Sequence, residues 1–575
     1  MQKLNGLDEM FLAYETVTTT CNMGGLSILQ PGSDPASGRL EAMRERIADR
    51  LDYLPVFRWR LTPNLLVGNR FWWEHGPVDL DQHVLGVTLP APGTDEQLAD
   101  LVSKLCRIPL ERDRPMWRFY VIEGLQGGRL AHLLKLSHGL ADGTAQARVI
   151  DILSDHPMQG LVHDPPPRQP EPANGYLELI GRAVGDLATT PVRAANVMWQ
   201  LGGWLTGRVK EEGLAGIPAA VARSLPGEYA RPAAALANRA RSSKQASPVG
   251  PGIPTLFPPR SAFNARLSGD FQFRFTELPL EDFRRAGKAA GGTINDAVLA
   301  VCAGAVRRYL QAHGGLPDKP LISCSPISFR TGAEKQPWAN HMYALFVPIP
   351  THLEDPVERL HWAHRSATAA KDNWQAGIGP ITRPVMGFMP WQPMAIGMEV
   401  MARSPDRAPG LPFNLPLSNV KGSKVTQRFA GAESLGFWPV PFMMPGVGIM
   451  LVFQSYKHRL NLGISVDKRV VPDLEFLLPL IADSLTELLH AQQLTADAPT
   501  PGPAPVQVRP ARTPTKRTGA AKPEGSVSAP PPSPRSNGKQ TGQSRTQKPA
   551  RPPATRSRQR PALNANAAPA ADVRG

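Results

Sequence analysis

The sequence predicts a two-lobed α/β protein, of the α+β kind, in which each lobe mixes helices and strands. Its 575 residues are enough for two or three domains, and an apolar fraction of 42% with a charged fraction of 20% is typical of a globular protein. Two breaks rich in proline, at 164–175 and 247–263, interrupt the helical and strand-like patterns. We therefore expect a first lobe at 1–160, a helical crossover at 161–262, a second lobe at 263–493 and a tail at 494–575.

The first lobe contains both kinds of periodicity. "LEAMRERIADRLDYL" (40–54) has apolar residues at helical spacing. "WRFYVIEGL" (117–125) and "RLAHLLKLS" (129–137) are short apolar runs typical of buried strands. This region is therefore predicted to be one mixed domain.

The second lobe repeats this mixture. Strands are expected at 271–280, 321–329, 343–350 and 460–467, and helices at 294–313 and 474–492. No short-period repeat is visible, but two mixed domains of similar size around a crossover suggest a two-lobed enzyme. The cleft between the lobes is then the expected position of the site.

The crossover carries an apolar stripe that predicts two helices joined near Pro191. The stripe consists of Leu177, Ile180, Val184, Leu187, Met198, Leu201, Leu205 and Val209. Such a stripe can lie on a membrane surface or pack on one of the lobes, and packing is the more common outcome.

An uncharged stretch at Ser434–Tyr456 is long enough to span a bilayer. Its proline and glycine residues are Pro439, Pro441, Pro445, Gly446 and Gly448. This punctuation favours two buried strands around a turn over a membrane helix.

The basic charge is concentrated in the tail. Of the net charge of +15, 12 charges come from residues 501–575, where 14 Lys and Arg face two acids. This segment has no aromatic residue and about one proline in five, so we expect it to stay disordered. Its basicity suits anionic lipid or nucleic acid, or it serves as a solvated tail; it lacks the aromatic residues that single-strand binders use.

The cysteines and the N-terminus favour a reducing, cytoplasmic location. Cys21, Cys106, Cys302 and Cys324 form no CxxC pair and have no histidine at metal-ligand spacing. The opening "MQKLNGLDEMFLAYE" has acids in its first apolar stretch and no cleavage pattern. Neither a zinc site nor a disulfide framework is expected.

The stretch "LKLSHGLADGT" is the strongest candidate for chemistry. Since a strand is expected before it and a helix at "GTAQARVIDIL" after it, His138 lies on a strand-to-helix connection where a side chain can enter a cleft. Asp142 is placed near the helix N-cap, and Gly143 allows a tight turn or a close approach. A lone loop histidine is also compatible with a purely structural role.

With its flanks, the sequence resembles the bacterial wax ester synthase/diacylglycerol acyltransferase family of the CoA-dependent acyltransferase superfamily. The resemblance covers about residues 4–493. It rests on segments in the family's order: "LNGLDEMFLAYE", "PVFRWRL", "DLDQHVLGVTLPAPG", "PLERDRPMWRFYVIEGLQGGRLAHLLKLSHGLADG", "TINDAVLA", "SPISFRTG", "NHMYALFVPIPT" and "LPLSNVKGS".

The resemblance implies a fold like that of chloramphenicol acetyltransferase and peptide-synthetase condensation domains, with a channel between the lobes. Acyl-CoA would enter one end and a lipid alcohol the other. His138 matches the second histidine of the family's HHxxxDG motif and would act as general base, and Ser137 replaces the first. Imidazole suits this role because its pKa lies near neutrality. No metal and no cofactor are expected, acyl-CoA being a substrate.

The resemblance also suggests roles for residues around the base. Asp142 would pair with Arg330 and shape the loop, so an Asp142→Ala change would act through misfolding. Asn295 and Asp296 match a family segment but also suit a helix start, with either residue as cap. Asn419 and Gly422 lie in a segment like the family's SNVPGP, with Lys421 in place of proline, and would hold or line the channel.

The leading hypothesis is an acyl-CoA-dependent O-acyltransferase that makes triacylglycerol from diacylglycerol or wax ester from fatty alcohol. Two alternatives stay open: transfer to another lipid or polyketide alcohol, and a catalytically weakened protein that binds lipid or coats inclusions. A peripheral position on the inner membrane or on lipid inclusions is expected, and nucleic acid is not an expected partner. Acceptor, acyl chain length and oligomeric state do not follow from the sequence.

Overall fold

A computed structural model describes most of the predicted lobes. It covers 2–4, 6–63, 71–76, 78–157, 258–328, 342–376 and 411–497, with isolated positions between them such as Trp338 and Asn340. The contacts divide the chain into one compact unit, Met1–Thr500, and the remainder, Pro501–Gly575. The predicted crossover helices, Arg330 and the basic tail lie outside the described residues.

The first half of the chain supplies helices and strands close to those predicted. Its helices are α1 (Gly6–Ala13), α2 (Leu40–Arg50), α3 (Leu80–His83), α4 (Asp95–Arg107) and α5 (Gly143–Leu153). Its strands are β1 (Gln2–Lys3), β2 (Asn22–Gln30), β3 (Trp59–Pro63), β4 (Phe71–His75), β5 (Val84–Thr88), β6 (Trp117–Glu123) and β7 (Leu130–Ser137). Thr94 begins α4 with a capping box completed by Gln97, so this helix start is fixed locally.

The second half contains the longer helices. These are α9 (Leu280–Ala289), α10 (Ile294–Ala312), α11 (Pro356–Ala376) and α14 (Leu474–Asp497). The strands are β8 (Phe271–Pro279), β9 (Leu321–Ser328), β10 (Met342–Ile349), β11 (Leu415–Val420), β12 (Arg428–Phe429), β13 (Ala432–Val440), β14 (Ile449–Tyr456) and β15 (Arg459–Asp467). The last helix runs past the expected end of the lobe at 493.

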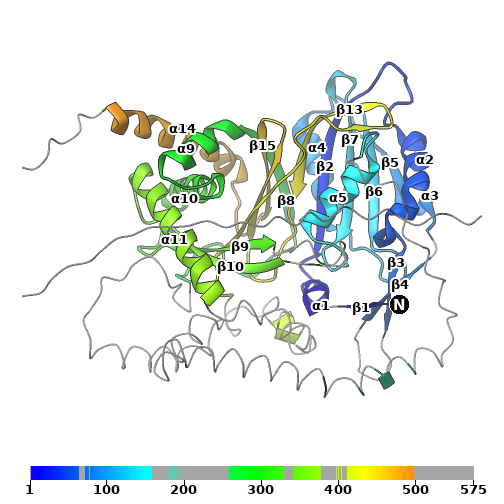
Figure 1. The fold of residues 1–575 in the computed structure, drawn as a ribbon, viewed down its shortest axis with the longest axis horizontal. Coiled ribbons are helices and arrows are strands. Elements are labelled where there is room, and N and C mark those ends of the chain that lie inside the picture. Colours follow the sequence, from blue (N-terminus) through cyan, green and yellow to red (C-terminus); the bar gives the residue numbers. More distant parts are fainter. Residues whose placement is uncertain are drawn as a thin grey trace, which may run out of the picture. The chain divides into compact units, whose positions relative to one another are not determined.

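Two six-stranded sheets form the two lobes, and a three-stranded sheet of β1, β4 and β3 accompanies the first. The first-lobe sheet has the order β12-β13-β2-β7-β6-β5, and the second-lobe sheet has the order β10-β9-β11-β14-β15-β8. The mixed two-lobed architecture expected from the sequence is therefore confirmed. Figure 1 shows the helices α9, α10, α11 and α14 gathered on the second lobe and the blue and cyan elements on the first.

One strand crosses from the second half of the chain into the first-lobe sheet. β13 pairs antiparallel with β2, and its yellow ribbon lies among blue and cyan strands in Figure 1. The uncharged stretch 434–456 thus forms two strands, as predicted, but β13 and β14 belong to different sheets. The period-two pattern identifies each strand without identifying its partner.

The crossing is held by alternate residues of β15. Asn461 Nδ2 donates to the Phe437 carbonyl at 2.8 Å, and Ser465 Oγ donates to the Pro441 carbonyl at 2.8 Å. Between them, a Cβ on Gly463 would lie 1.8 Å from the Pro439 carbonyl oxygen. Glycine at 463 therefore allows β13 to approach the backbone of β15.

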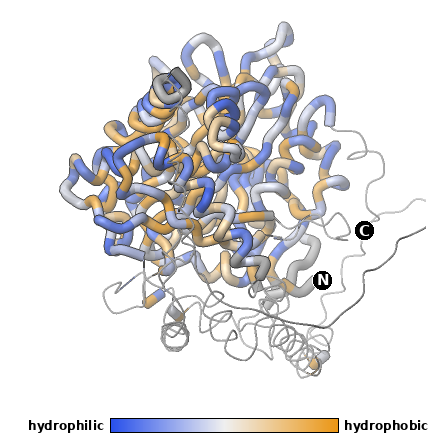
Figure 2. The backbone as a smooth tube through the Cα atoms, turned by 60° about the vertical axis from the view of Figure 1, so that its left-hand side comes forward, coloured by the Kyte–Doolittle hydropathy of each residue, from blue (hydrophilic) through white to orange (hydrophobic). Residues whose placement is uncertain are grey.

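Among the described residues, no single helix has the length and apolarity needed to cross a bilayer. Only the pair α9 and α10 reaches the required length together, and the two are bent by 98°. Most of α10 is buried in the core of the second lobe. Figure 2 shows hydrophobic and hydrophilic stretches alternating over short distances along the tube.

Candidate active site

His138 lies on the connection between β7 and α5, as the sequence predicts. β7 ends at Ser137 and α5 begins at Gly143. The backbone N–H of His138 donates to the Cys21 carbonyl at 2.9 Å, just before β2. Its side chain is 5% exposed, so the surroundings of the ring are set by the protein.

Two aromatic rings fix the orientation of the His138 imidazole. Phe11 of α1 stacks on it with ring centroids 3.9 Å apart and an interplanar angle of 30°. Phe442 meets it edge-on at 4.9 Å and 68°. Phe442 follows β13, so the strand that crosses into the first-lobe sheet positions this ring beside His138. Such ring contacts restrict the rotation of a catalytic imidazole.

Asn340, from the second half of the chain, joins His138 to α1. Its Nδ2 donates to the His138 carbonyl at 2.8 Å and to the Asp8 carboxylate at 2.7 Å. All three residues are buried. One amide therefore holds both the loop that carries the base and the helix that carries Phe11.

Burial lowers the pKa of His138 from its ordinary value of 6.5 to about 4. Its own backbone carbonyl, the Asp142 carboxylate and Asn340 raise the pKa by smaller amounts. The ring nitrogen Nδ1 makes no hydrogen bond of ordinary geometry within the part of the chain that the structure describes. The imidazole is therefore neutral at pH 7 and able to accept a proton.

Asp142 occupies the predicted N-cap of α5. Its carboxylate accepts from the Ala145 backbone N–H at 2.8 Å, and the side chain is buried. This contact fits the structural role expected for Asp142 in the loop. The pairing with Arg330 stays a prediction because Arg330 lies outside the described residues.

The glycine with a close approach at this loop is Gly139. A Cβ on Gly139 would lie 3.0 Å from Leu12 Cγ and 3.1 Å from the Asp8 carbonyl oxygen. At Gly143, a Cβ would meet only Val420 Cγ2, at an ordinary 3.6 Å. Among the described atoms, the closer approach is therefore at Gly139, where α1 packs on the loop, and the tight turn or close approach expected at Gly143 stays a prediction.

Ser137 is fully buried opposite Asn22 in the pairing of β7 with β2. Its backbone N–H donates to the Met116 carbonyl at 3.0 Å. The hydroxyl has no hydrogen-bond partner among the described residues, and neither has the side-chain amide of Asn22. Two polar groups without described partners thus lie on neighbouring strand ends beside the base.

The segment with Asn419 and Gly422 lies next to the start of α5. Val420, between these two residues, faces Gly143. Gly422 donates to Ser455 Oγ at 3.0 Å, and a Cβ there would lie 2.0 Å from the Ser455 carbonyl oxygen. The segment therefore lies against the start of α5, and its predicted role in holding or lining the channel stays a prediction.

Asn295 and Asp296 lie at the start of α10, where the N-cap is Thr293 and neither of the two predicted residues. Asp296 completes the capping box by accepting from the Thr293 backbone N–H at 2.8 Å. It also contacts His364 of α11 at 3.1 Å. These contacts favour the helix-start interpretation of this segment over a place in the channel.

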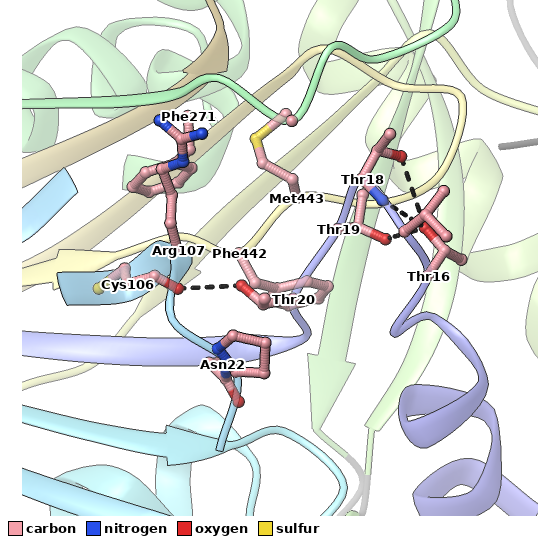
Figure 3. Close-up of a pocket in the computed structure, with 13 residues that line it drawn as sticks. Thr16, Thr18, Thr19, Thr20, Asn22, Cys106, Arg107, Phe271, Phe442 and Met443 are labelled. Atoms are coloured by element: carbon pink, nitrogen blue, oxygen red, sulfur yellow. Dashed lines mark hydrogen bonds between the residues drawn. The ribbon is translucent and has the colours of Figure 1, made fainter. Parts of the chain in front are cut away.

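A cavity of about 190 Å³ lies next to Phe442. It is lined by the threonine segment 16–20, Asn22, the end of α4 with Pro109, the start of β8, and Phe442 with Met443. Figure 3 shows Arg107 beside Phe271 on one side of the cavity and Thr16, Thr18 and Thr19 on the other. Phe442 also touches the His138 ring, so the cavity and His138 share this residue as a neighbour.

Comparison with known proteins decides the family. Residues 4–298 match the model of the wax ester synthase/diacylglycerol acyltransferase catalytic domain, and residues 338–489 match the model of the C-terminal domain of the same family. The chain belongs to this family. It is therefore an acyltransferase.

Named relatives and a solved structure agree with this membership. Two Mycobacterium tuberculosis proteins named as candidate diacylglycerol O-acyltransferases, Rv3740c and Rv1760, are each 29% identical over 85% of this chain, and cover 99% and 90% of their own length. The wax ester synthase/diacylglycerol acyltransferase from Marinobacter aquaeolei VT8 is 22% identical, with a TM-score of 0.53 over 85% of this chain and all of that chain. That structure supports the two-lobed fold.

Sequence reasoning missed four residues of this wax ester synthase/diacylglycerol acyltransferase site: Phe11, Asn22, Asn340 and Phe442. Phe11 and Asn340 lie in the segments "LDEMFLAYE" and "NHMYALF", which carry the resemblance, so a signal for them was present. Asn22 and Phe442 depend on strand pairing and the crossing, which no local pattern encodes. Among the described residues, no group of three or more His, Cys, Asp or Glu is arranged to hold a metal ion.

Proposed function

We propose that this protein transfers an acyl group from acyl-CoA to the hydroxyl of a neutral lipid alcohol, giving triacylglycerol from diacylglycerol or wax ester from a fatty alcohol. One observation carries the proposal: a buried neutral histidine, His138, is held between two rings, one of which also lines a cavity. Family membership and the names of the relatives support this choice of substrates.

The chemistry requires a base in contact with the alcohol. An unactivated hydroxyl is too weak an acid to ionise beforehand, so its proton must leave as the oxygen attacks the thioester carbonyl carbon. His138 accepts that proton while the new C–O bond forms. As the C–S bond breaks, the imidazolium returns the proton to the departing CoA thiolate. The reaction balances with acyl-CoA and alcohol alone, so the proposal includes no cofactor and no metal.

The environment of His138 suits this cycle. The neutral imidazole keeps one ring nitrogen without a proton, and this nitrogen can accept the proton of the alcohol. The apolar rings exclude water, which limits hydrolysis of the thioester. Asp142 raises the pKa of His138 and so favours the transient imidazolium, although burial outweighs this effect in the resting state.

We also propose a cytoplasmic protein that works peripherally at the inner membrane or on lipid inclusions. The two substrates support this location, because acyl-CoA is water-soluble whereas diacylglycerol and long-chain alcohols partition into lipid. Flotation of the full-length protein with vesicles containing diacylglycerol tests it. Recovery of all the protein in the unbound fraction at physiological salt would contradict it.

The activity is tested with purified full-length protein, palmitoyl-CoA, and either diolein or hexadecanol. We expect release of free CoA and formation of the corresponding ester. His138→Ala should abolish both while the protein keeps its melting temperature within a few degrees. His156→Ala is a matched control, because His156 is exposed and follows α5.

The outcomes separate the alternatives. Turnover by His138→Ala at the wild-type rate would remove His138 as base. Lipid binding without CoA release in the wild type would favour the weakened, lipid-binding alternative. Activity with a polyketide alcohol but with neither diolein nor hexadecanol would replace the proposed acceptor.

A further inference from the structure

The cavity next to Phe442 is lined by polar threonines and has a cation at its rim. The threonines lie in the segment 16–20. Thr20 Oγ1 donates to the Cys106 carbonyl at 3.0 Å, which joins this segment to the C-terminal end of α4. Arg107, the last residue of α4, is 49% exposed and pairs with Asp270 at 2.9 Å.

The end of α4 that carries Arg107 is held in place by a buried side chain. Lys135 of β7 is fully buried, and its Nζ donates to the carbonyls of Leu105 and Ile108 on either side of Cys106 and Arg107. Burial lowers the pKa of Lys135 to about 8, so the ammonium still bears its proton at neutral pH. The position of the rim cation therefore does not depend on the Asp270 contact alone.

Charge at the rim is more positive than negative. Asp270 faces both Arg107 at 2.9 Å and Lys468 at 3.8 Å. One carboxylate between two cations leaves an excess positive charge at the entrance. Guanidinium and ammonium groups of this kind bind phosphate oxygens.

Asn22, which lines the cavity, is a buried polar side chain without a described hydrogen-bond partner. Its side chain is 2% exposed, and neither its Nδ2 nor its Oδ1 has a hydrogen-bond partner among the described residues. The threonine hydroxyls around it do have internal partners, as in the 2.8 Å contact of Thr16 with Thr19 and the 2.6 Å bond of Thr19 to the Tyr14 carbonyl. A buried carboxamide without a partner is costly, and a ligand amide that accepts from Nδ2 and donates to Oδ1 would remove that cost.

The cavity also lies close to His138. Asn22 follows Cys21, whose carbonyl receives the His138 N–H at 2.9 Å. Phe442 lines the cavity and touches the His138 ring. The part of the cavity at Asn22 and Phe442, which lie near each other in Figure 3, is therefore the part near His138.

We propose that this cavity binds the pantetheine arm of the acyl-CoA donor, with Asn22 hydrogen-bonded to a pantetheine amide and Arg107 facing the CoA phosphates. The assignment rests on the proposed function and specifies which end of the channel takes the donor. The pantetheine arm is an amide-containing polar chain that CoA joins to phosphates, whereas diacylglycerol and fatty alcohols are neutral and mostly hydrocarbon. A threonine wall, an unpaired carboxamide and a rim cation fit the first and not the second.

The Asn22 contact is tested with donors that differ in their amides. We compare acyl pantetheine and acyl N-acetylcysteamine, which contain amides, with the S-propyl thioester of the same acid, which has none. Asn22→Leu should lower kcat/KM about 3- to 10-fold for the amide-containing donors and leave the S-propyl thioester unaffected. Asn22→Ser, a smaller polar change, provides the same comparison if the leucine variant folds poorly.

The Arg107 contact is tested with donors that differ in their phosphates. Arg107→Gln should lower kcat/KM for acyl-CoA about three- to fivefold and leave acyl pantetheine unchanged. Arg39→Gln is the matched control, because Arg39 makes a similarly exposed pair with Glu123 at 2.8 Å and does not line the cavity. It should change neither donor.

Two results would overturn the assignment. If the Asn22 and Arg107 variants raise KM for the alcohol and leave all donors unchanged, the cavity takes the acceptor. If Asn22→Leu lowers kcat/KM equally for donors with and without an amide, Asn22 has only a structural role. Either result in an active wild-type enzyme leaves the proposed function intact, whereas a wild type that releases no CoA contradicts the function itself.

Discussion

The amide nitrogen of Asn340 lies 2.8 Å from the backbone carbonyl oxygen of His138. The two residues are far apart in the sequence, and the same amide also reaches Asp8 on α1 at 2.7 Å. The bond goes to the backbone of His138, so we expect Asn340 to act by positioning His138. A small displacement of a catalytic group is enough to slow a reaction strongly.

Asn340→Ala should therefore reduce kcat and leave substrate binding nearly intact. We expect kcat to fall about ten- to hundredfold, with KM for both substrates within about twofold of wild type. The buried His138 carbonyl also loses its donor, which should lower the free energy of unfolding by about 1 to 3 kcal/mol. Steady-state kinetics and urea unfolding measure the two effects.

Exchanging the two side chains separates positioning from stability. In Asp8→Asn/Asn340→Asp the pair can still form one hydrogen bond, but the carboxylate introduced at position 340 cannot donate to the His138 carbonyl. We expect the exchange to recover most of the stability lost in Asn340→Asp alone, while kcat stays low. If kcat recovers together with stability, Asn340 has no positioning role.

Three buried histidines should make the protein less stable in acid. Burial lowers the pKa of His83, His132 and His138 from 6.5 to about 4 in each case. Between these values the unfolded chain binds more protons than the native protein, so the free energy of unfolding falls as the pH falls from 6.5 to 4. The loss should be up to about 1.4 kcal/mol per pH unit for each histidine, and above pH 6.5 the contribution is fully present.

Urea unfolding at pH 7.5, 6.0 and 5.0 measures this slope. His132→Gln should reduce the pH dependence of the free energy of unfolding by the contribution of one histidine, because glutamine does not titrate. Glutamine can still donate to the Gly38 carbonyl that His132 Nε2 contacts at 2.7 Å. Stability that is independent of pH between 5 and 6.5 would show that these residues are not held neutral.

Much of the fold could be predicted because local periodicity is strong. The predicted helix at 294–313 is α10 (Ile294–Ala312), and the predicted strand at 129–137 is β7 (Leu130–Ser137). The destination of β13 could not be predicted, since its partner β2 lies some 400 residues away and pairing leaves no local trace. Asn461, Gly463 and Ser465 alternate along β15 and contact β13 or the residue after it. Their spacing can be interpreted in this way only when the positions of the Phe437 and Pro441 carbonyls are known.

Gly463→Ala tests that crossing. The added Cβ would lie 1.8 Å from the Pro439 carbonyl oxygen, so β13 has to shift. We expect the free energy of unfolding to fall by about 1 to 3 kcal/mol, and kcat to fall as well because β13 leads to Phe442. Gly315→Ala is the matched control, since its nearest neighbour, Leu310 Cδ2, would be 3.9 Å away. Equal melting temperatures for the two variants would contradict this account.

The polar residues of the candidate site could be predicted from the sequence, whereas most of the residues that surround His138 could not. His138 and Asp142 follow from residue type and position between a strand and a helix, and the structure places both as expected. The residues that orient the base come from α1, position 340 and the end of β13, which only tertiary packing brings together. The close approach of α1 at Gly139 likewise depends on tertiary packing.

Ser137, which replaces the first histidine of the family motif, should be dispensable. Its hydroxyl is buried and has no partner among the described residues, so Ser137→Ala should keep kcat within about twofold and leave the free energy of unfolding unchanged or raised by up to about 1 kcal/mol. Ser137→His would force an imidazole into a fully buried position and should lower the melting temperature without raising kcat. Assays with palmitoyl-CoA and diolein, with thermal melts, compare the two variants. A tenfold loss in Ser137→Ala, or a gain in Ser137→His, would instead mean that this position takes part in the reaction.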